Sequence, residues 1–168
     1  MLPHLDAAYS LARWLVRDPS LAEDVVQDAM LRALTYFQGF RGGDARAWLL
    51  RIVRNVAHGA LAARRRQPAE TLDWAADGAD SAALRVPAPQ DDPEMALGRL
   101  QDQERLERAL FALPVELREC LVLREVEELS YKEIAGVTGL PVGTVMSRLW
   151  RARRKLMGCE PAETVHGD

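Results

Sequence analysis

Cysteine, histidine and aromatic residues are scarce in this chain. Its 168 residues include two Cys and three His, and Phe, Trp and Tyr together make up 6%. Cys120 and Cys159 lie far apart and show no Cys-x-x-Cys or Cys/His ligand spacing, so we expect neither a metal site nor a cofactor. The sequence offers no nucleophile–base pair either, and the chain is therefore not expected to be an enzyme.

Long hydrophobic runs are absent as well. No apolar stretch approaches the roughly 18–20 residues that span a bilayer. The N-terminal segment lacks the basic start and apolar block of a signal peptide. Together with the few thiols, these absences predict a reduced, cytoplasmic protein without membrane insertion. β-Branched runs are equally rare, whereas Ala, Leu and Arg dominate, which favours an all-α fold.

The charges nearly cancel over the whole chain, but they are unevenly distributed. The formal net charge of −3 by itself argues against a nucleic-acid partner. Residues 41–66 nevertheless carry seven Arg against one Asp, and residues 148–155 carry four Arg and one Lys; residues 70–128 hold fifteen Asp and Glu against six Arg. Two basic poles around an acidic middle can produce a phosphate-binding field, although ordinary solvated helix faces are an alternative interpretation.

The pattern of apolar residues divides the chain into two small helical domains. Residues 1–66 and residues 94–157 show helical periodicity. Between them, residues 67–93 have no sustained period and contain four of the nine Pro, which predicts a flexible acidic linker. Residues 158–168 are predicted to form a tail.

Local signals mark the helices of the first domain. An amphipathic helix is predicted over His4–Val16. Ser20, with Glu23 three residues later, predicts a capping box at the start of a second helix. Asp44 is predicted to cap a third helix, and Trp48 falls in the apolar stripe of that helix, so we interpret it as a core residue.

The second domain begins with apolar residues at helical spacing. They are Met95, Leu97, Leu100, Leu106 and Leu110. Pro114 then opens another helix. Cys120 lies among leucines of that helix, and we interpret it as a core residue and not as a nucleophile.

The stretch SYKEIAGVTGLPVGTVMSRLWRARRKL predicts a helix-turn-helix. Ser130 and Glu133 form a second capping-box signal, so a helix begins there. Gly139 can adopt the positive φ that ends it. Closely crossing helices need a small residue, a turn glycine and an apolar anchor, and Ala135, Gly139 and Val145 meet these needs.

The second helix of this motif has two distinct faces. Its apolar residues repeat at i, i+4, i+7 and i+11: Val145, Leu149, Ala152 and Leu156. The opposite face carries Thr144, Ser147, Arg148, Arg151 and Lys155. Arg can bind guanine edges with two hydrogen bonds, and Ser or Thr can bind bases or phosphates, so this face predicts DNA binding. The alternative is a basic surface helix without a partner.

Two blocks of the sequence resemble the bacterial sigma-70 family, in particular sigma factors of the extracytoplasmic-function (ECF, group 4) type. LPVELRECLVLREVEELSYKEIAGVTGLPVGTVMSRLWRAR resembles the sigma-4 domain, which binds the promoter −35 element. LAEDVVQDAMLRAL and FRGGDARAWLLRIVRN resemble the sigma-2 domain, which grips RNA polymerase and opens the −10 element. A lone helix-turn-helix is a weak signal, whereas both blocks in this order are a strong one.

The resemblance implies partners and site residues. Core RNA polymerase is expected to bind through the clamp helices of its largest subunit and the flap of its second-largest subunit, with a cognate anti-sigma factor as regulator. Its clamp helices would contact Asp24, Gln27 and Asp28, which are otherwise a solvated acidic face. The −10 element would contact Arg51, Arg54, Asn55, Arg64, Arg65 and Arg66, with Asn55 helping to hold a flipped base. The −35 element would contact Tyr131, Thr144, Met146, Ser147, Arg148, Trp150, Arg151 and Lys155.

Two departures and two alternatives accompany this interpretation. Met146 stands where many members of the family carry a basic residue, and HGALAARRR is less uniformly polar than the corresponding family segment. One alternative is a stand-alone helix-turn-helix regulator that works without polymerase. The other is a sigma mimic that sequesters an anti-sigma factor, although such a mimic is expected to lose the arginines equivalent to Arg148 and Arg151.

Overall fold

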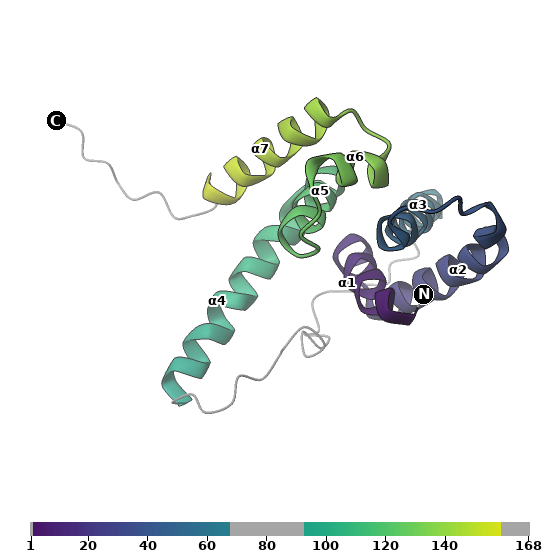
Figure 1. The fold of residues 1–168 in the computed structure, drawn as a ribbon. Helices are drawn as coiled ribbons and strands as arrows, with labels where there is room; N and C mark the ends of the chain where they lie inside the picture. Colours follow the sequence, from purple (N-terminus) through teal and green to yellow (C-terminus); the bar gives the residue numbers. More distant parts are fainter. Residues whose placement is uncertain (1, 68–92, 159–168) are drawn as a thin grey trace.

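The computed structural model describes residues 2–67 and 93–158. Regular structure within these ranges is entirely helical, which confirms the predicted all-α fold (Figure 1). The linker predicted over residues 67–93 and the tail predicted over residues 158–168 lie almost wholly outside the described residues. None of the described helices is long and apolar enough to cross a membrane.

Three α-helices pack together in the N-terminal half, residues 2–67. The elements are η1 (Leu2–His4), α1 (Leu5–Val16), α2 (Pro19–Tyr36), η2 (Phe37–Gly39) and α3 (Ala45–Arg66). Each α-helix contacts the other two, and the core between them contains Leu11, Leu15, Val25, Leu49, Leu50 and Val53. Burial of aliphatic side chains on one stripe of each helix is what stabilises such a bundle.

The cap of α2 differs from the prediction. Asp18, and not Ser20, is the N-cap, because its Oδ1 accepts hydrogen bonds from the backbone N–H groups of Ser20 (2.9 Å) and Leu21 (3.3 Å). Pro19 occupies the first helical position, which needs no N–H donor, and so moves the helix start upstream. The predicted Ser20–Glu23 capping box is therefore wrong. The predicted Asp44 cap of α3 is confirmed by its bond from the Arg46 N–H (2.9 Å).

The C-terminal half, residues 93–158, is built around α5. Its helices are α4 (Pro93–Ala112), α5 (Val115–Glu125), α6 (Tyr131–Thr138) and α7 (Val142–Gly158). α5 and α7 contact each other extensively, and α6 packs against α7. The most buried side chains of this half include Cys120, Leu123, Ile134, Val145, Leu149 and Ala152, which confirms Cys120 as a core residue.

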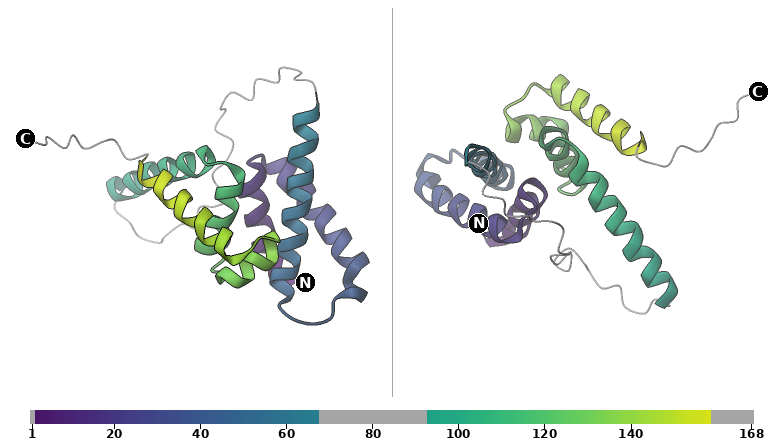
Figure 2. Two further views of the ribbon diagram at one scale, coloured as in Figure 1. Left: turned by 90° about the horizontal axis from the view of Figure 1, so that it is seen from above. Right: turned by 180° about the vertical axis from the view of Figure 1, so that it is seen from behind.

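Most of α4 projects away from the other helices (Figures 1 and 2). It contains no buried residue, and Met95, Leu97 and Leu106 of its apolar stripe are more than half exposed. Most of the stripe predicted from sequence is thus left uncovered by the part of the chain that the structure describes. Only the C-terminal end of α4 meets the core, where Leu110 and Phe111 pack against it.

The two halves pack directly on each other. α5 lies against α1, and α6 lies against α3, as the view from above in Figure 2 shows. Phe111 stacks on Trp14 at a centroid distance of 5.2 Å. The Arg118 guanidinium, buried between the halves, donates hydrogen bonds to the carbonyl oxygens of Trp14 (2.6 Å) and Leu15 (3.1 Å) at the C-terminal end of α1. A cation at the C-terminal end of a helix satisfies its unpaired carbonyl oxygens and interacts favourably with the helix dipole.

The cap assignment can be tested by mutation. Asp18→Ala is expected to lower the free energy of unfolding by about 1 kcal/mol, because it leaves the first N–H groups of α2 without an acceptor. Ser20→Ala is expected to change it by less than about 0.5 kcal/mol, since the exposed Ser20 side chain caps nothing. Urea unfolding followed by circular dichroism measures both. Asp18→Asn, which keeps an acceptor oxygen but loses the Arg64 ion pair, is the control; a larger loss for Ser20→Ala than for Asp18→Ala would contradict the assignment.

Candidate nucleic-acid interface

α6 and α7 form a helix-turn-helix whose local geometry matches the sequence signals. The Ser130–Glu133 capping box is confirmed, with the Ser130 N–H donating to Glu133 Oε2 (2.7 Å) and the Glu133 N–H donating to Ser130 Oγ (3.2 Å). Gly139 ends α6 with a φ of 73°, and its N–H bonds the Ala135 carbonyl (2.9 Å). The capped start and the left-handed glycine together fix the turn that leads into α7.

The apolar face of α7 is buried as predicted. Val145, Leu149 and Ala152 are buried, and Leu156 packs against the core at its edge. Five of the residues predicted to face the −35 element are exposed: Met146, Ser147, Trp150, Arg151 and Lys155. Thr144 is half-buried. Trp150 is 59% exposed and has the Arg154 guanidinium 4.9 Å from its ring centroid, so this face presents a cation–π pair beside hydrogen-bonding groups.

Two other residues predicted to contact the −35 element have partners within the chain. Arg148 turns toward α5, where its Nη1 lies 3.8 Å from Glu119 Oε1 and its side chain is 20% exposed. The half-buried Tyr131 ring has the Arg124 guanidinium 4.9 Å from its centroid. Neither side chain is as accessible as Arg151, so the structure does not bring all eight predicted residues onto one open surface.

The residues predicted for −10 contact lie along α3. Arg51, Asn55, Arg65 and Arg66 are exposed. Arg64 pairs with the α2 cap, Asp18, at 2.7 Å. Arg54 is turned inward and binds Glu119 with both ends of its guanidinium, at 2.9 Å and 3.0 Å. α3 therefore presents an open basic face and one arginine that is held by the C-terminal half.

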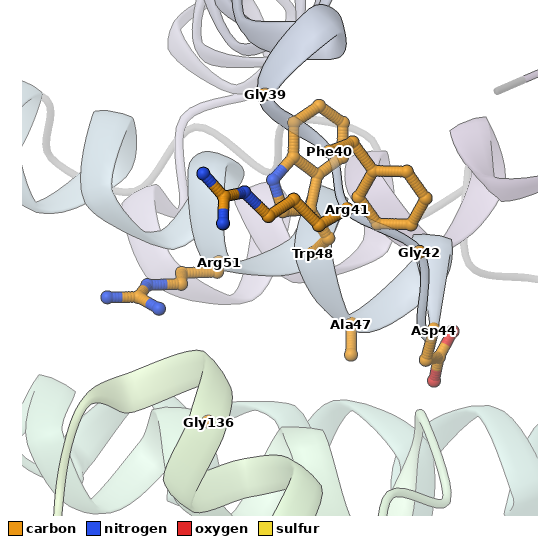
Figure 3. Close-up of a pocket in the computed structure, with 9 residues that line it drawn as sticks. All are labelled: Gly39, Phe40, Arg41, Gly42, Asp44, Ala47, Trp48, Arg51 and Gly136. Carbon is orange, nitrogen blue, oxygen red and sulfur yellow. The ribbon is translucent and has the colours of Figure 1, made fainter.

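A pocket with aromatic walls lies at the start of α3 (Figure 3). Its volume is about 290 Å³, and it is lined by Gly39, Phe40, Arg41, Gly42, Asp44, Ala47, Trp48, Arg51 and Gly136. The Phe40 and Trp48 rings lie 5.2 Å apart. Gly42 and Gly43 carry φ values of 86° and 114°, which L side chains rarely adopt, and so shape the loop that forms one wall.

This pocket revises two interpretations from sequence. Trp48 packs against the core, as expected, but it also lines the pocket. Phe40 and Arg41 were missed, although an aromatic–arginine pair before a Gly-Gly turn is a visible signal. Aromatic rings beside two guanidinium groups can stack a nucleobase and bind its phosphate. Asn55, to which the sequence assigned the flipped base, does not line this pocket.

Asn55 lines a second groove, between α2 and α3. This groove, of about 450 Å³, is also lined by Asp24, Asp28 and Arg32. Arg32 forms an ion pair with Asp28 at 3.0 Å. Gln27 is exposed on the same helix. The structure thus brings together residues that the sequence assigned to polymerase and to promoter DNA.

Both blocks of the chain match known families. The model described as sigma-70 region 2 matches residues 2–67, and the model described as sigma-70, region 4 matches residues 103–156. The RNA polymerase sigma-H factor of Pseudomonas aeruginosa is 38% identical over 142 residues, which cover 84% of this chain and 74% of that protein. The ECF RNA polymerase sigma-E factor of Escherichia coli is 35% identical over 134 residues, covering 79% of this chain and 70% of that protein. The chain belongs to the ECF sigma factors.

Solved structures agree with this assignment. The sigma factor RpoE of Bartonella quintana, in complex with the anti-sigma factor NepR, matches with a TM-score of 0.70 and 29% identity, covering 94% of this chain and 91% of that one. CnrH in complex with the cytosolic domain of CnrY matches with a TM-score of 0.64 and 26% identity, covering 94% and 82%. The family consists of transcription regulators rather than enzymes.

The sigma factor also contains a buried charged residue that the sequence did not mark. Glu119 of α5 has no exposed surface, and its carboxylate contacts Arg54 and His58 of α3, the latter at 2.6 Å. Burial alone raises the pKa of Glu119, but the hydrogen bonds and charges of His58 and Arg54 outweigh it and hold the pKa below its ordinary value of 4.5. Glu119 is therefore an anion at neutral pH, and the stability it contributes is lost only as pH falls through that lowered pKa.

The neighbouring thiol of this sigma factor is expected to be unreactive. Burial, and then the negative charge of Glu119, raise the pKa of Cys120 from 9.0 to about 11. At pH 8 its thiolate fraction is then about 100-fold lower than that of an ordinary cysteine, in addition to the steric protection. Ellman's reagent applied to a Cys159→Ser variant measures this, with the same variant in urea as the control. Equal rates for the folded and unfolded chains would contradict the placement of Cys120.

Proposed function

We propose that this sigma factor binds core RNA polymerase, directs it to promoters with −35 and −10 elements, and starts DNA melting. The observation that carries the proposal is one chain that combines a helix-turn-helix with an exposed polar face and a separate basic helix beside a pocket with aromatic walls. A stand-alone regulator needs only the first of these surfaces. The protein would act by binding, without catalysis, and in the cytoplasm.

The −35 element is assigned to α7. Ser147 and Arg151 lie one turn apart on its exposed face, with Lys155 one turn further on. A helix of this kind enters the major groove, where Arg reads guanine and Ser or Lys binds phosphate. Met146, 51% exposed on the same helix, offers an apolar contact in place of a basic one.

The −10 element is assigned to α3 and the loop before it. Arg51 lies at the edge of the pocket that Phe40 and Trp48 line, and in Figure 3 the Arg41 and Arg51 side chains both extend along the same side of that pocket. Melting requires a base to leave the duplex stack, which costs a few kcal/mol that stacking and phosphate contacts must offset. Asn55, one turn further along α3, adds an amide that can hydrogen-bond a second nucleotide.

The polymerase-binding surface is assigned to the acidic edge of α2. Asp24 and Gln27 are exposed and Asp28 is half-buried, and all three lie within one turn. Short carboxylate and amide side chains on a rigid helix suit basic residues of the clamp helices, while the C-terminal half would bind the flap. With residues 67–93 as a linker, binding at one end raises the effective concentration at the other.

An anti-sigma factor is the proposed regulator. RpoE and CnrH, which share this fold, were solved in complex with the anti-sigma factor NepR and with the cytosolic domain of CnrY. The identity of the regulator of this chain is not implied by those names. The exposed apolar residues of α4 and the exposed face of α7 are surfaces available for binding a protein partner.

Run-off transcription with core polymerase on a genomic library tests the proposed function. Addition of the sigma factor is expected to produce transcripts that core polymerase alone does not make. The variant Asp24→Lys with Asp28→Lys is expected to abolish them and to reduce polymerase capture at least tenfold, because like charges would then face the clamp helices. Asp6→Lys, at an exposed position of α1 outside the α2 edge, is the charge-reversal control. Full capture by the α2 variant would exclude this edge as the docking surface.

Substitution of two arginines of α7 tests the assignment of this helix to the −35 element. Arg151→Ala is expected to weaken binding to a −35 duplex by roughly 1–3 kcal/mol and to relax specificity at one base pair. Arg153→Ala removes the same charge from a side chain that pairs with Glu125 at 2.8 Å, so its effect is expected to be small and independent of sequence. Fluorescence anisotropy with specific and scrambled duplexes measures both. Equal losses for the two variants would argue against base reading by Arg151.

A further inference from the structure

The two DNA-reading helices lie too close together in this structure to bind both promoter elements at once. α6 of the helix-turn-helix packs on α3, and Gly136 of α6 lines the same pocket as Arg51 of α3 (Figure 3). The −35 and −10 elements are about 25 base pairs apart, roughly 85 Å at 3.4 Å per base pair. If the proposed function holds, on which this step rests, the halves must separate before the protein can act.

The seam between the halves contains polar bonds as well as apolar packing, since the buried apolar residues of both halves form one cluster. Arg118 donates to the carbonyls of α1, as described above. Arg46 of α3 donates to the Glu127 carboxylate (2.5 Å) and to the Glu127 carbonyl oxygen (2.8 Å). Trp14 and Phe111 add one aromatic stack. Water and phosphate can replace these polar bonds when the halves part, whereas the apolar part of the contact loses its burial energy.

Glu119 lies at the centre of this seam. Its two carboxylate oxygens accept from Arg54 at 2.9 and 3.0 Å, contact His58 at 2.6 Å, and face Arg148 at 3.8 Å. Arg54 belongs to the helix assigned to the −10 element and Arg148 to the helix assigned to the −35 element. One buried carboxylate therefore binds an arginine of one DNA-reading helix and lies within ion-pair distance of an arginine of the other.

We infer that Glu119 is an internal latch that keeps this sigma factor closed and occupies Arg54 and Arg148 until promoter phosphates replace its carboxylate. The exchange is chemically matched, since carboxylate and phosphate oxygens both accept paired bonds from guanidinium groups. Opening returns Glu119 to water, so rehydration of the carboxylate partly offsets the loss of its bonds to Arg54 and His58. Promoter DNA that binds only the open form then shifts the population toward it.

Distance measurement between the halves tests the latch. Spin labels on Ser20→Cys in α2 and Met157→Cys in α7, both exposed, report the separation in a Cys120→Ala, Cys159→Ser background. Double electron–electron resonance on the full chain is expected to give one dominant short distance without DNA. Glu119→Gln is expected to raise the ratio of open to closed molecules by about tenfold or more, seen as a longer and broader distribution, because a neutral amide leaves two partly buried arginines, Arg54 and Arg148, without a counter-charge.

A matched control lies on the same helix. Glu125→Gln breaks an ion pair of α5, with Arg153, that lies within the C-terminal half, so its distance distribution is expected to stay that of the parent chain. Arg54→Gln approaches the latch from the other half and removes both hydrogen bonds of Arg54 to Glu119, leaving His58 as its close partner; it is expected to open the chain even if Glu119→Gln fails to fold. An unchanged distribution in Arg54→Gln, or in a folded Glu119→Gln, overturns the latch.

Transcription separates this inference from the proposed function. If the distances lengthen but no variant or parent chain supports run-off transcription, the latch stands and the proposed function fails. If the parent chain supports transcription but Glu119→Gln keeps the short distance, the function stands and the latch is overturned. If the parent chain supports transcription and the distances in Glu119→Gln lengthen, both proposals stand. Glu119→Gln is then expected to bind forked promoter DNA more tightly than the parent chain does in the absence of polymerase. Its apparent Kd should fall by the factor by which its open fraction rises.

Discussion

A carboxylate with no exposed surface must be surrounded by donors, and that requirement organises this molecule around Glu119. Ionised Glu119 cannot remain buried unless Arg54 and His58 reach it from the other half of the chain. Arg118, the preceding residue, is a buried cation that needs hydrogen-bond acceptors. Backbone carbonyl oxygens at the C-terminal end of α1 provide them. Two adjacent charges on α5 thus determine how α1 and α3 lie against it.

That arrangement connects stability with DNA recognition. The guanidinium groups near Glu119 also have a proposed role in DNA binding, since Arg54 and Arg148 come from the two helices with the strongest DNA-binding signals. Each can bind either an internal carboxylate or a phosphate, but not both with full geometry. Exposed neighbours such as Arg51 and Arg151 remain free to meet DNA first. Under the proposed function, initial contact by the exposed arginines and full engagement by Arg54 and Arg148 are therefore distinct steps.

Local signals in the sequence predicted much of the fold, because helices are specified locally. Ser130, Asp44 and Gly139 act within one turn of themselves, so their roles were predicted correctly. Asp18 was overlooked in favour of Ser20, since Pro19 makes either residue a plausible cap. Glu119 could not be recognised as a partner of Arg54, because the two are 65 residues apart and no periodic pattern connects them. The pocket was missed for a similar reason: Phe40 and Gly136 meet only after the halves pack.

The contact between the two halves combines apolar packing with polar bonds. The buried leucines and valines of both halves form one cluster, so separation of the halves costs the free energy of exposing part of that apolar surface. Glu119, Arg118 and the Arg46–Glu127 pair add bonds that water or phosphate can replace. In the proposed opening, contacts with promoter and polymerase therefore have to offset the apolar part of the cost, while the exchange of carboxylate for phosphate offsets the polar part.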